Sequence, residues 1–319
     1  MEAAQRLGGS LCRCLCKTID LVAAPRVSVI IPTFNHAQFL GMALDSVRAQ
    51  TVCDWEAIVV NNFSTDSTHA VVAAQRDARI KIIDFANRGV IAASRNQGIA
   101  LAKGGFLAFL DSDDTWCPKK LELALLRLQD GFDLVCHGEI WLYPGNVQRE
   151  VIYGPERRAT FEALLFDGNC ISTSAVVVRR DWVSKVGGFD EDTGLVTAED
   201  YHLWLKLARG GAKIGFLRES LGTYRIHDSN ASRGVLRNVA ATRAVFEKVF
   251  AQLDATTPIL KLKRWRRLAI LDYSCARGLQ AAGQHWAAFA WFLKAIFRWP
   301  LAPKYYAAML LNCLGVKSI

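Results

Sequence analysis

Three carboxylates fall within four consecutive residues near the middle of the chain, at Asp111, Asp113 and Asp114. Acids this close together repel one another unless a cation or water compensates their charge. Mg²⁺ and Mn²⁺ prefer oxygen ligands, and Mg²⁺ is often bound by one or two carboxylates together with substrate phosphates. The cluster therefore predicts a site for a divalent cation and a diphosphate. An acidic turn, or the start of a following helix, is the alternative.

Apolar runs that end in polar residues occur three times in the first half of the chain, and each run predicts a buried strand. The runs and the polar residues after them are 27–31 with Thr33 and Asn35, 55–60 with Asn61 and Asn62, and 106–110 with Asp111 and Asp113. Ligands of open α/β sheets bind beyond the carboxyl ends of the strands. We therefore expect these three strand ends to form one site.

Segments with helical spacing lie between these strands. We expect helices at 37–49, 66–75, 90–101 and 118–128, a further strand at 80–85, and Ser64 or Thr65 as the N-cap of the second helix. Strand and helix alternate four times with short links. This alternation predicts an α/β fold with an open, mainly parallel sheet covered by helices on both faces.

The second half of the chain is less regular. We expect mixed strands and short helices over 132–178, including 171–178, then a helix at Glu199–Arg209 and a last strand at 221–226 that ends at His227. Beyond Val235 the pattern is wholly helical. These features predict an N-terminal extension at 1–24, a catalytic domain at 25–234 and a helical, basic C-terminal region at 235–319.

The formal charge of +9 is concentrated in the C-terminal region. From Val235 onward there are 13 Lys/Arg and 3 Asp/Glu, against 26 and 27 in the preceding residues. This distribution predicts that the C-terminal region contacts an anionic membrane surface and disfavours a nucleic-acid cleft in the body. The contact would use the basic segment 261–267 with its Trp265, and the apolar segment 286–296, which is too short to span a bilayer but could lie in its interface. Trp286, Trp291 and Trp299 fall in or just after that apolar segment. The alternative is a helical pair that packs on the catalytic domain with a solvated basic face.

The nine cysteines do not form a disulfide pattern, since their number is odd and they are scattered. Cys12, Cys14 and Cys16 are spaced alternately, which is poor spacing for one metal ion, so we interpret them as reduced thiols. Charged residues interrupt residues 1–24, and no signal peptide is expected there. These features indicate a cytoplasmic protein, with the inner face of the cell membrane as a place of peripheral contact.

Five ordered blocks between Val27 and Ser232 resemble the family 2 glycosyltransferases of the GT-A fold, of the kind that builds bacterial surface polysaccharides. The blocks are VSVIIPTFNHAQFLGMALDSVRAQT, IVVNNFSTDST, GVIAASRNQGIALAKGGFLAFLDSDD, VGGFDEDTGLVTAEDYHLWLKLA and YRIHDSN. Any one block alone is a weak signal, but five in order are specific. The resemblance implies a nucleotide-binding open mixed sheet flanked by helices, with the C-terminal helices as an extension.

The resemblance implies a set of residues that bind the nucleotide-sugar donor. They are Pro32, Thr33, Asn35, Asn61, Asn62, Arg95, Asp111 and Ser112. Asn61 and Asn62 depart from the family pattern, which has two acids there, one of which accepts a hydrogen bond from the donor base. An Asn carbonyl can also accept from a uracil N–H, but its amide can instead donate, so the base stays open. For Arg95 the alternative is a surface salt bridge.

The resemblance also implies a metal site and an acceptor side. Asp113 and His227 would hold Mn²⁺ or Mg²⁺, which would neutralise the leaving diphosphate. Asp114 and Trp204 would lie on the acceptor side, with Trp204 either packed beneath the site or stacked on a sugar. The catalytic pair would be Glu199 and Asp200, with Asp200 as the base that deprotonates the acceptor hydroxyl. Both acids would also favour the N-terminus of their helix.

Together these features predict an inverting, metal-dependent glycosyltransferase that uses a nucleoside diphosphate sugar, with a UDP-sugar favoured. Its acceptor would be a hydroxyl of a lipid-linked oligosaccharide or polysaccharide. A nucleotidyltransferase is an alternative, although its first loop is typically rich in glycine and basic residues, unlike residues 32–35. A nucleotide-sugar-binding module without catalysis is a second alternative, which Asn61 and Asn62 keep open.

Overall fold

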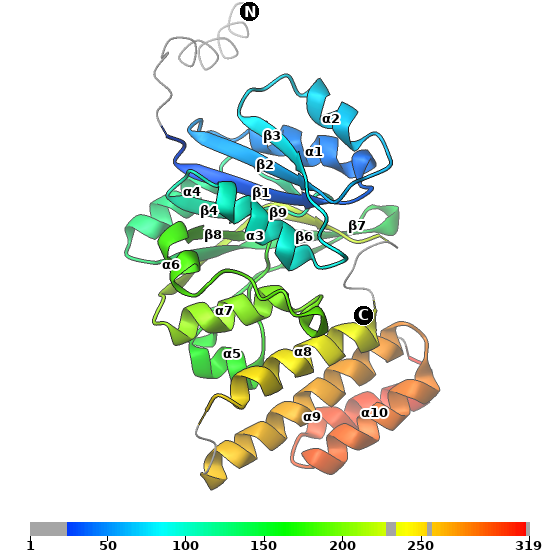
Figure 1. Ribbon diagram of the computed structural model, residues 1–319. Helices are drawn as coiled ribbons and strands as arrows, with labels where there is room; N and C mark the ends of the chain where they lie inside the picture. The colour runs from blue at the N-terminus through cyan, green and yellow to red at the C-terminus, as the bar shows by residue number, and fades with distance from the viewer. Residues whose placement is uncertain (1–23, 228–233, 254–256, 317–319) are drawn as a thin grey trace, which may run out of the picture.

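The computed structural model describes residues 24–227, 234–253 and 257–316. Cys12, Cys14, Cys16 and nearly all of the expected N-terminal extension lie outside these residues. In the described part, nine strands form one sheet, with helices on both of its faces and four further helices at one side of the molecule (Figure 1). The α/β fold expected from the sequence is confirmed.

The sheet is mixed, with a parallel half and an irregular half. Its strand order is β3-β2-β1-β4-β8-β6-β9-β5, and β7 pairs with β6. The strands are β1 (Val27–Thr33), β2 (Trp55–Asn61), β3 (Ile80–Asp84), β4 (Phe106–Phe109), β5 (Thr115–Trp116), β6 (Leu134–Tyr143), β7 (Val147–Val151), β8 (Val176–Arg179) and β9 (Ile214–Arg225). The strands β1 to β4 run parallel, whereas β8 is antiparallel to both β4 and β6.

Apolar side chains alternate between the two faces of the central strands. In β1, Ile30 belongs to one apolar cluster, whereas Val29 and Ile31 belong to the other, as the two-residue period of a strand requires. Leu44 of α1 and Leu125 of α4 pack on the Val29 face. The helices on that face are α1 (Ala37–Arg48), α2 (Thr68–Ala74) and α4 (Lys120–Gln129). Those on the other face are α3 (Ile91–Leu101), α5 (Phe161–Asp167), α6 (Arg180–Lys185) and α7 (Glu199–Arg209).

Several expected boundaries differ from the structure, and three of them have a clear local cause. Helix α2 begins two residues later than expected, because the Asp66 carboxylate accepts backbone N–H groups of Ala37 and Thr68 and neither Ser64 nor Thr65 caps the helix. The strand expected at 171–178 is only Val176–Arg179, since residues 172–174 use their side chains in polar contacts. The last strand is β9, which is twice as long as expected because β6 pairs along most of its length.

The C-terminal helices pack against one another and against the catalytic region. They are α8 (Val235–Phe250), α9 (Pro258–Ala281), α10 (His285–Arg298) and α11 (Pro303–Cys313). Phe246 of α8 and Leu268 of α9 belong to the same apolar cluster as Trp204 of α7. The core of the catalytic region therefore continues into α8 and α9, as Figure 1 shows with α8 directly beside α5 and α7.

The basic segment of α9 faces the catalytic region. Lys263 pairs with Glu162, Arg264 with Glu247 at 3.0 Å, and Arg266 with Asp167 at 2.8 Å. Arg267 is buried. Most charges of segment 261–267 therefore pair within the protein, and a membrane contact through this segment stays a prediction.

Candidate active site

The carboxyl ends of the parallel strands form one edge. Thr33 lies opposite Asn61, and Asn61 lies opposite Asp84 at the end of β3. Leu110, just before the acidic cluster, donates its N–H to the Ile30 carbonyl across 3.1 Å. The polar residues expected to converge therefore do lie together at this edge.

Asn35 connects the loops that follow β1 and β2. Its φ of 51° is in the left-handed region, which Asn adopts more readily than most residues. Its N–H donates to the Ser64 hydroxyl and its Oδ1 accepts from the Thr65 N–H, both at 2.8 Å. Nearby, Thr33 is buried, and its hydroxyl finds no hydrogen-bond partner among the described residues. A buried hydroxyl without a partner is costly, so Thr33 is well placed to contact a ligand.

Asn61 and Asn62 hold neighbouring loops together. Asn61 donates from Nδ2 to Asp84 Oδ1 at 2.6 Å and accepts the Ser64 N–H at 3.1 Å. Asn62 accepts the Asn87 N–H at 3.0 Å. Asp84, whose side chain is 37% exposed, therefore supplies a carboxylate at the edge where Asn61 and Asn62 replace the family's acids.

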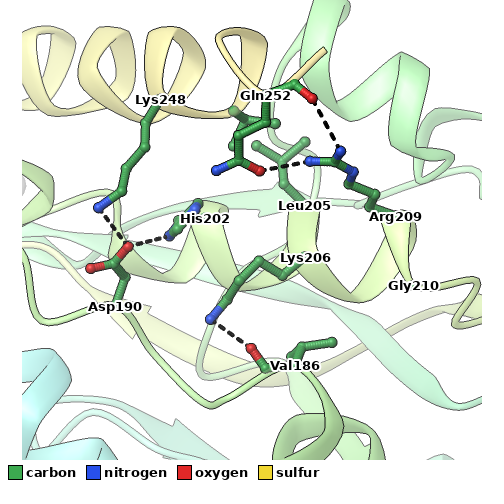
Figure 2. Close-up of a pocket in the computed structure, with 10 residues that line it drawn as sticks. Val186, Asp190, His202, Leu205, Lys206, Arg209, Gly210, Lys248 and Gln252 are labelled. Atoms are coloured by element: carbon green, nitrogen blue, oxygen red, sulfur yellow. Dashed lines mark hydrogen bonds and ion pairs between the residues drawn. The ribbon is translucent and has the colours of Figure 1, made fainter. Parts of the chain in front are cut away.

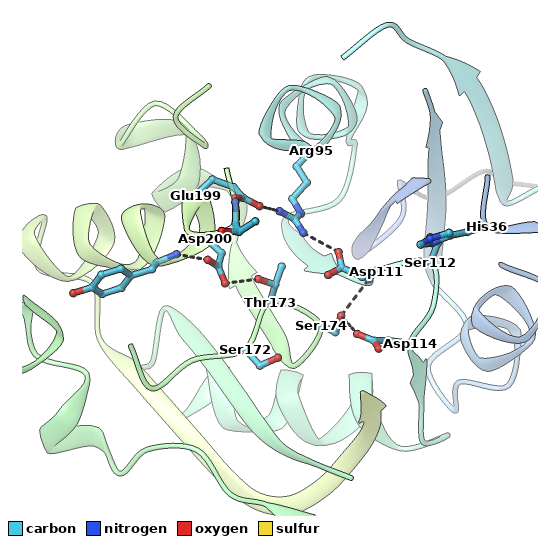
Figure 3. A network of polar contacts seen from close by, with 12 residues as sticks. His36, Arg95, Asp111, Ser112, Asp114, Ser172, Thr173, Ser174, Glu199 and Asp200 are labelled. Carbon is cyan, nitrogen blue, oxygen red and sulfur yellow. Dashed lines mark hydrogen bonds and ion pairs between the residues drawn. The ribbon is translucent and has the colours of Figure 1, made fainter. Parts of the chain in front are cut away.

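Arg95 is the central cation of the site (Figure 3). It is 3% exposed, and its two terminal nitrogens contact Asp111 Oδ1 at 2.8 Å and Glu199 Oε1 at 2.6 Å. Burial alone would lower the pKa of Arg95, but the carboxylates of Asp111 and Glu199 outweigh it and raise that pKa. The alternative of a surface salt bridge is therefore wrong. Arg95 links the end of β4 to the start of α7.

The acidic cluster divides into two parts with different surroundings. Asp111 and Asp113 line the edge, whereas Asp114 is 1% exposed. Asp114 accepts the Ser174 hydroxyl at 2.6 Å and the Arg225 N–H at 3.0 Å, so it ties the acidic loop to β9. This geometry corrects the expectation that Asp114 faces the acceptor.

Two histidines meet at the acidic cluster. His227 Nε2 lies 2.8 Å from Asp113 Oδ2, and His36 Nδ1 lies 3.0 Å from the Ser112 hydroxyl. The two imidazole rings pack edge to face at 5.8 Å, and Phe39 stacks on His227 at 4.7 Å. Burial and then Asp111 raise the pKa of Asp113. An additional positive charge would therefore stabilise the ionised form of Asp113.

Asp200 is the second residue of helix α7, on the side that faces the cluster (Figure 3). Its carboxylate accepts the Thr173 hydroxyl at 2.9 Å and the Tyr201 N–H at 2.6 Å. Burial, followed by the charge of Glu199, raises the pKa of Asp200 to about 6. Asp200 therefore combines a fixed orientation with a basicity above that of an ordinary aspartate.

Glu199 and Trp204 have supporting positions. Both oxygens of Glu199 are used, by Arg95 and by the Thr197 N–H at 2.8 Å, so Glu199 positions the site and is not free to act as a base. Trp204 is fully buried and its ring lies 6.5 Å from that of Phe109. Of the two roles expected for Trp204, the structure gives packing beneath the site and contradicts stacking on a sugar.

Sequence reasoning missed four polar residues at this site, namely His36, Asp84, Thr173 and Ser174. Ser174 contacts two parts of the acidic loop, since its hydroxyl accepts the Asp111 N–H at 3.1 Å and donates to Asp114. The signal was the run Ser172-Thr173-Ser174, which we included in a strand. Three consecutive hydroxyl residues ahead of a buried strand favour side-chain contacts over ladder pairing.

The side chains at this edge fit a divalent cation whose remaining ligands come from the substrate. Among the described residues, no group of three or more His, Cys, Asp or Glu side chains could hold a metal ion by itself. Asp113 and His227 nevertheless present an oxygen and a nitrogen ligand 2.8 Å apart, beside Asp111. Mg²⁺ commonly takes one or two protein carboxylates, with phosphates and water as the remaining ligands.

A separate cavity of about 480 Å³ lies between α7, α8 and the loop before α7 (Figure 2). Its charged groups pair with one another, since Lys248 bridges Asp190 and Asp192 at 2.8 and 3.1 Å. Lys206 donates to the carbonyls of Val186 and Gly188. These contacts fasten the 186–192 loop to both α7 and α8, and the cavity is separate from the strand-edge site.

Comparison with known proteins identifies the class to which this fold and site belong. The family model for glycosyl transferase family 2 matches residues 28–187, half of the chain. The chain therefore belongs to glycosyltransferase family 2, and it is a glycosyltransferase of the GT-A fold.

Named relatives and solved structures agree with this family. An uncharacterized glycosyltransferase of Nostoc is 33% identical over 64% of this chain and 66% of its own. The Escherichia coli UDP-Glc:alpha-D-GlcNAc-diphosphoundecaprenol beta-1,3-glucosyltransferase WfgD is 29% identical over 65% of this chain and 79% of its own. The mannosyltransferase PcManGT of Pyrobaculum calidifontis, solved with GDP-Man and Mn²⁺, matches with a TM-score of 0.61 and 19% identity over 92% and 86% of the two chains. The structural likeness concerns the fold.

Proposed function

We propose that this glycosyltransferase moves a sugar from a nucleoside diphosphate to a hydroxyl of a lipid-linked oligosaccharide or polysaccharide, with inversion at the anomeric carbon. The observation that carries the proposal is the Arg95 bridge between Asp111 and Glu199. One guanidinium joins the strand edge that would hold the donor to the helix that carries Asp200. A single displacement needs donor and base to be held together in this way.

In this reaction Asp200 takes the proton of the acceptor hydroxyl. The acceptor oxygen forms a bond to the anomeric carbon while the bond from that carbon to the phosphate oxygen breaks. Its electron pair leaves with the nucleoside diphosphate. A pKa of about 6 leaves Asp200 ionised at neutral pH and makes it a stronger base than an ordinary aspartate. Thr173 and the Tyr201 N–H orient the carboxylate.

Asp113 and His227 are the residues that would hold Mn²⁺ or Mg²⁺. A bound cation would neutralise the negative charge that develops on the leaving diphosphate. Asp113 would gain from such a cation, since burial and Asp111 both disfavour its ionised form. The donor phosphates would complete the ligands.

The position of Asp84 favours a nucleotide-sugar donor whose base carries a ring N–H, as uracil does. A carboxylate can only accept hydrogen bonds when ionised, so it matches a ring N–H and does not match the bare ring nitrogen of adenine. Asn61 holds Asp84 by a hydrogen bond of 2.6 Å. A UDP-sugar is favoured, because the name of WfgD specifies UDP-Glc. The lipid-linked acceptor is proposed on the same ground, since that name specifies a diphosphoundecaprenol acceptor.

The other two hypotheses have less support. Family 2 membership favours sugar transfer over nucleotidyl transfer. A binding module without catalysis would not need a buried arginine that aligns a basic carboxylate with the donor edge. The departure at Asn61 and Asn62 is compensated by Asp84.

Release of nucleoside diphosphate from a panel of UDP-, GDP- and dTDP-sugars, with Mn²⁺ and with a chelator, tests the proposal. We expect turnover with Mn²⁺ and a UDP-sugar, and a loss of about 10²-fold or more in Asp200→Asn. Asp130→Asn, at an exposed acid that pairs with Arg127, should match the wild type. An inert wild-type protein that still binds UDP would refute catalysis, and full activity in the chelator would refute the metal.

A further inference from the structure

The last part of the chain has an unusual charge composition. Residues 273–319 contain five Lys/Arg and no Asp or Glu, although the whole chain has 30 acids in 319 residues. The segment also carries Trp286, Trp291 and Trp299. In the described residues it forms the end of α9 and all of α10 and α11.

Helix α10 has two apolar faces, of which one is covered. Ala288, Phe292 and Ala295 are fully buried on the inner face. On the outer face, Trp286 and Phe297 are 91% and 83% exposed, with Leu293 between them at the same helical spacing. A helix that is apolar all round is normally buried on all sides, so the outer face of α10 lacks its partner.

Helix α11 and the turn before it also carry exposed apolar side chains. Leu310 and Leu314 are 62% and 68% exposed and lie one helical turn apart, and Leu301 in the turn is 77% exposed. Figure 1 shows α10 at the outer edge of the C-terminal helices, with α9 between it and α8. We call the exposed side chains Trp286, Leu293, Phe297, Leu301, Leu310 and Leu314 the outer apolar face.

The charges around this face indicate which kind of partner it would bind. Lys294, next to Leu293 in the sequence, and Lys304, three residues after Leu301, are both exposed. Two copies of the face would bring cations together with no acid from residues 273–319 to pair with them, and like charges disfavour such a contact. An anionic bilayer supplies both an apolar interior and negative headgroups. Tryptophan is also the residue that favours the boundary between them.

The lengths and composition of these helices suit a contact with the membrane surface and not a membrane span. Within the part of the chain that the structure describes, no helix is both long enough and apolar enough to cross a membrane. An amphipathic helix that lies in the bilayer boundary inserts its apolar side chains without spanning. The basic segment of α9 is unsuited to this role, because its side chains pair with Glu162, Glu247 and Asp167.

We propose that the outer apolar face of α10 and α11 docks on an anionic lipid bilayer, with Lys294 and Lys304 contacting the headgroups. This inference does not depend on the reaction proposed above. It keeps the membrane contact expected for the C-terminal region and assigns it to the exposed side chains of α10 and α11.

Co-sedimentation with vesicles tests the proposal on the full chain. The vesicles are phosphatidylcholine alone or phosphatidylcholine with roughly a third phosphatidylglycerol, a composition chosen to mimic an anionic leaflet. We expect binding to the anionic vesicles and a reduction of about tenfold or more in Phe297→Gln/Leu310→Gln. The control Leu126→Gln/Val147→Gln changes side chains of similar exposure, 52% and 61%, on α4 and β7 and should bind as the wild type does.

A charge variant and a size measurement complete the design. Lys294→Gln/Lys304→Gln should lose the preference for anionic over neutral vesicles. The proposal is overturned if the wild type pellets with neither vesicle, or if Phe297→Gln/Leu310→Gln binds as the wild type does. A wild-type dimer that Phe297→Gln/Leu310→Gln converts to a monomer, without vesicle binding, would assign the face to a second copy and also refute the bilayer. Donor hydrolysis should be the same in all variants, so failure here is separable from failure of the proposed reaction.

Discussion

Arg95 connects residues that are far apart in the sequence. Asp111 is 16 positions away and Glu199 is 104 positions away, yet one guanidinium contacts both. A buried cation between two carboxylates is costly to remove, because Glu199 would then be left buried without this partner and Asp111 would lose its ion pair. At the scale of single residues, the site therefore depends on the planar, two-pronged shape of arginine.

The substitution Arg95→Lys tests the need for that shape. Lysine keeps the charge, but its single ammonium group cannot reproduce both contacts, so we expect kcat to fall roughly 10- to 100-fold. The melting temperature should fall too, since Glu199 is 5% exposed and would lose a contact. Arg79→Lys, at a more exposed pair with Asp77, is the control and should leave kcat unchanged. Wild-type kcat in Arg95→Lys would rule out the bridge as a positioning element.

The pKa of Asp200 predicts a pH dependence. The base must be ionised, so kcat/KM should level off roughly one pH unit above the pKa of about 6 and fall about tenfold per unit below it. The hydrogen bond from Thr173 lowers the pKa of Asp200. Thr173→Val removes that bond and should move the acid limb of the profile to higher pH. A limb near pH 4, or one that is unmoved in Thr173→Val, would contradict the assignment of Asp200.

At the scale of elements, helix α7 supports the site through its buried face. Its first residues are Glu199 and Asp200, and its side chains Tyr201, Trp204 and Leu205 are all buried. Tyr201 donates its hydroxyl to the Leu164 carbonyl at 2.6 Å, which fixes α7 against α5. The position of the base therefore follows from the packing of the whole helix.

Trp204 provides the prediction at this scale. Trp204→Ala should lower the free energy of unfolding by about 3–5 kcal/mol, because a fully buried indole is removed. Trp286→Ala, at a side chain that is 91% exposed, should change it by no more than about 0.5 kcal/mol. Urea unfolding measures both. Equal, small effects in the two variants would contradict the packing role of Trp204.

At the scale of the whole molecule, the C-terminal helices belong to two environments. Phe246 and Leu268 complete the apolar cluster around α7, whereas Phe292 and Ala308 form a separate cluster of the C-terminal helices. Lys248 of α8 also forms an ion pair with Asp190 in the loop that precedes α7. The inner helices are therefore part of the catalytic core, and α10 and α11 form its periphery.

Truncation distinguishes these two environments. A chain that ends at Gly234 would expose the partners of α8 and α9 and is expected to aggregate or unfold. A chain that ends at Gly283 keeps both helices and should still be stabilised by UDP with Mn²⁺ in a thermal-shift measurement. A chain ending at Gly234 with the wild-type melting temperature would show that the catalytic region folds without α8 and α9.

The amino-acid sequence by itself predicted the strand-helix order, the strand-edge location of the site and the family. These features follow from local patterns, namely apolar runs, helical spacing and polar residues directly after strands. Only the tertiary structure revealed that Asp114 is inward and bound to Ser174, that Asp84 lies beside Asn61, and that Arg95 is buried. The same holds for the charges of α9, which face the catalytic region while α10 and α11 leave an apolar face open. Which face of an element is covered depends on partners distant in the sequence, so periodicity alone does not determine it.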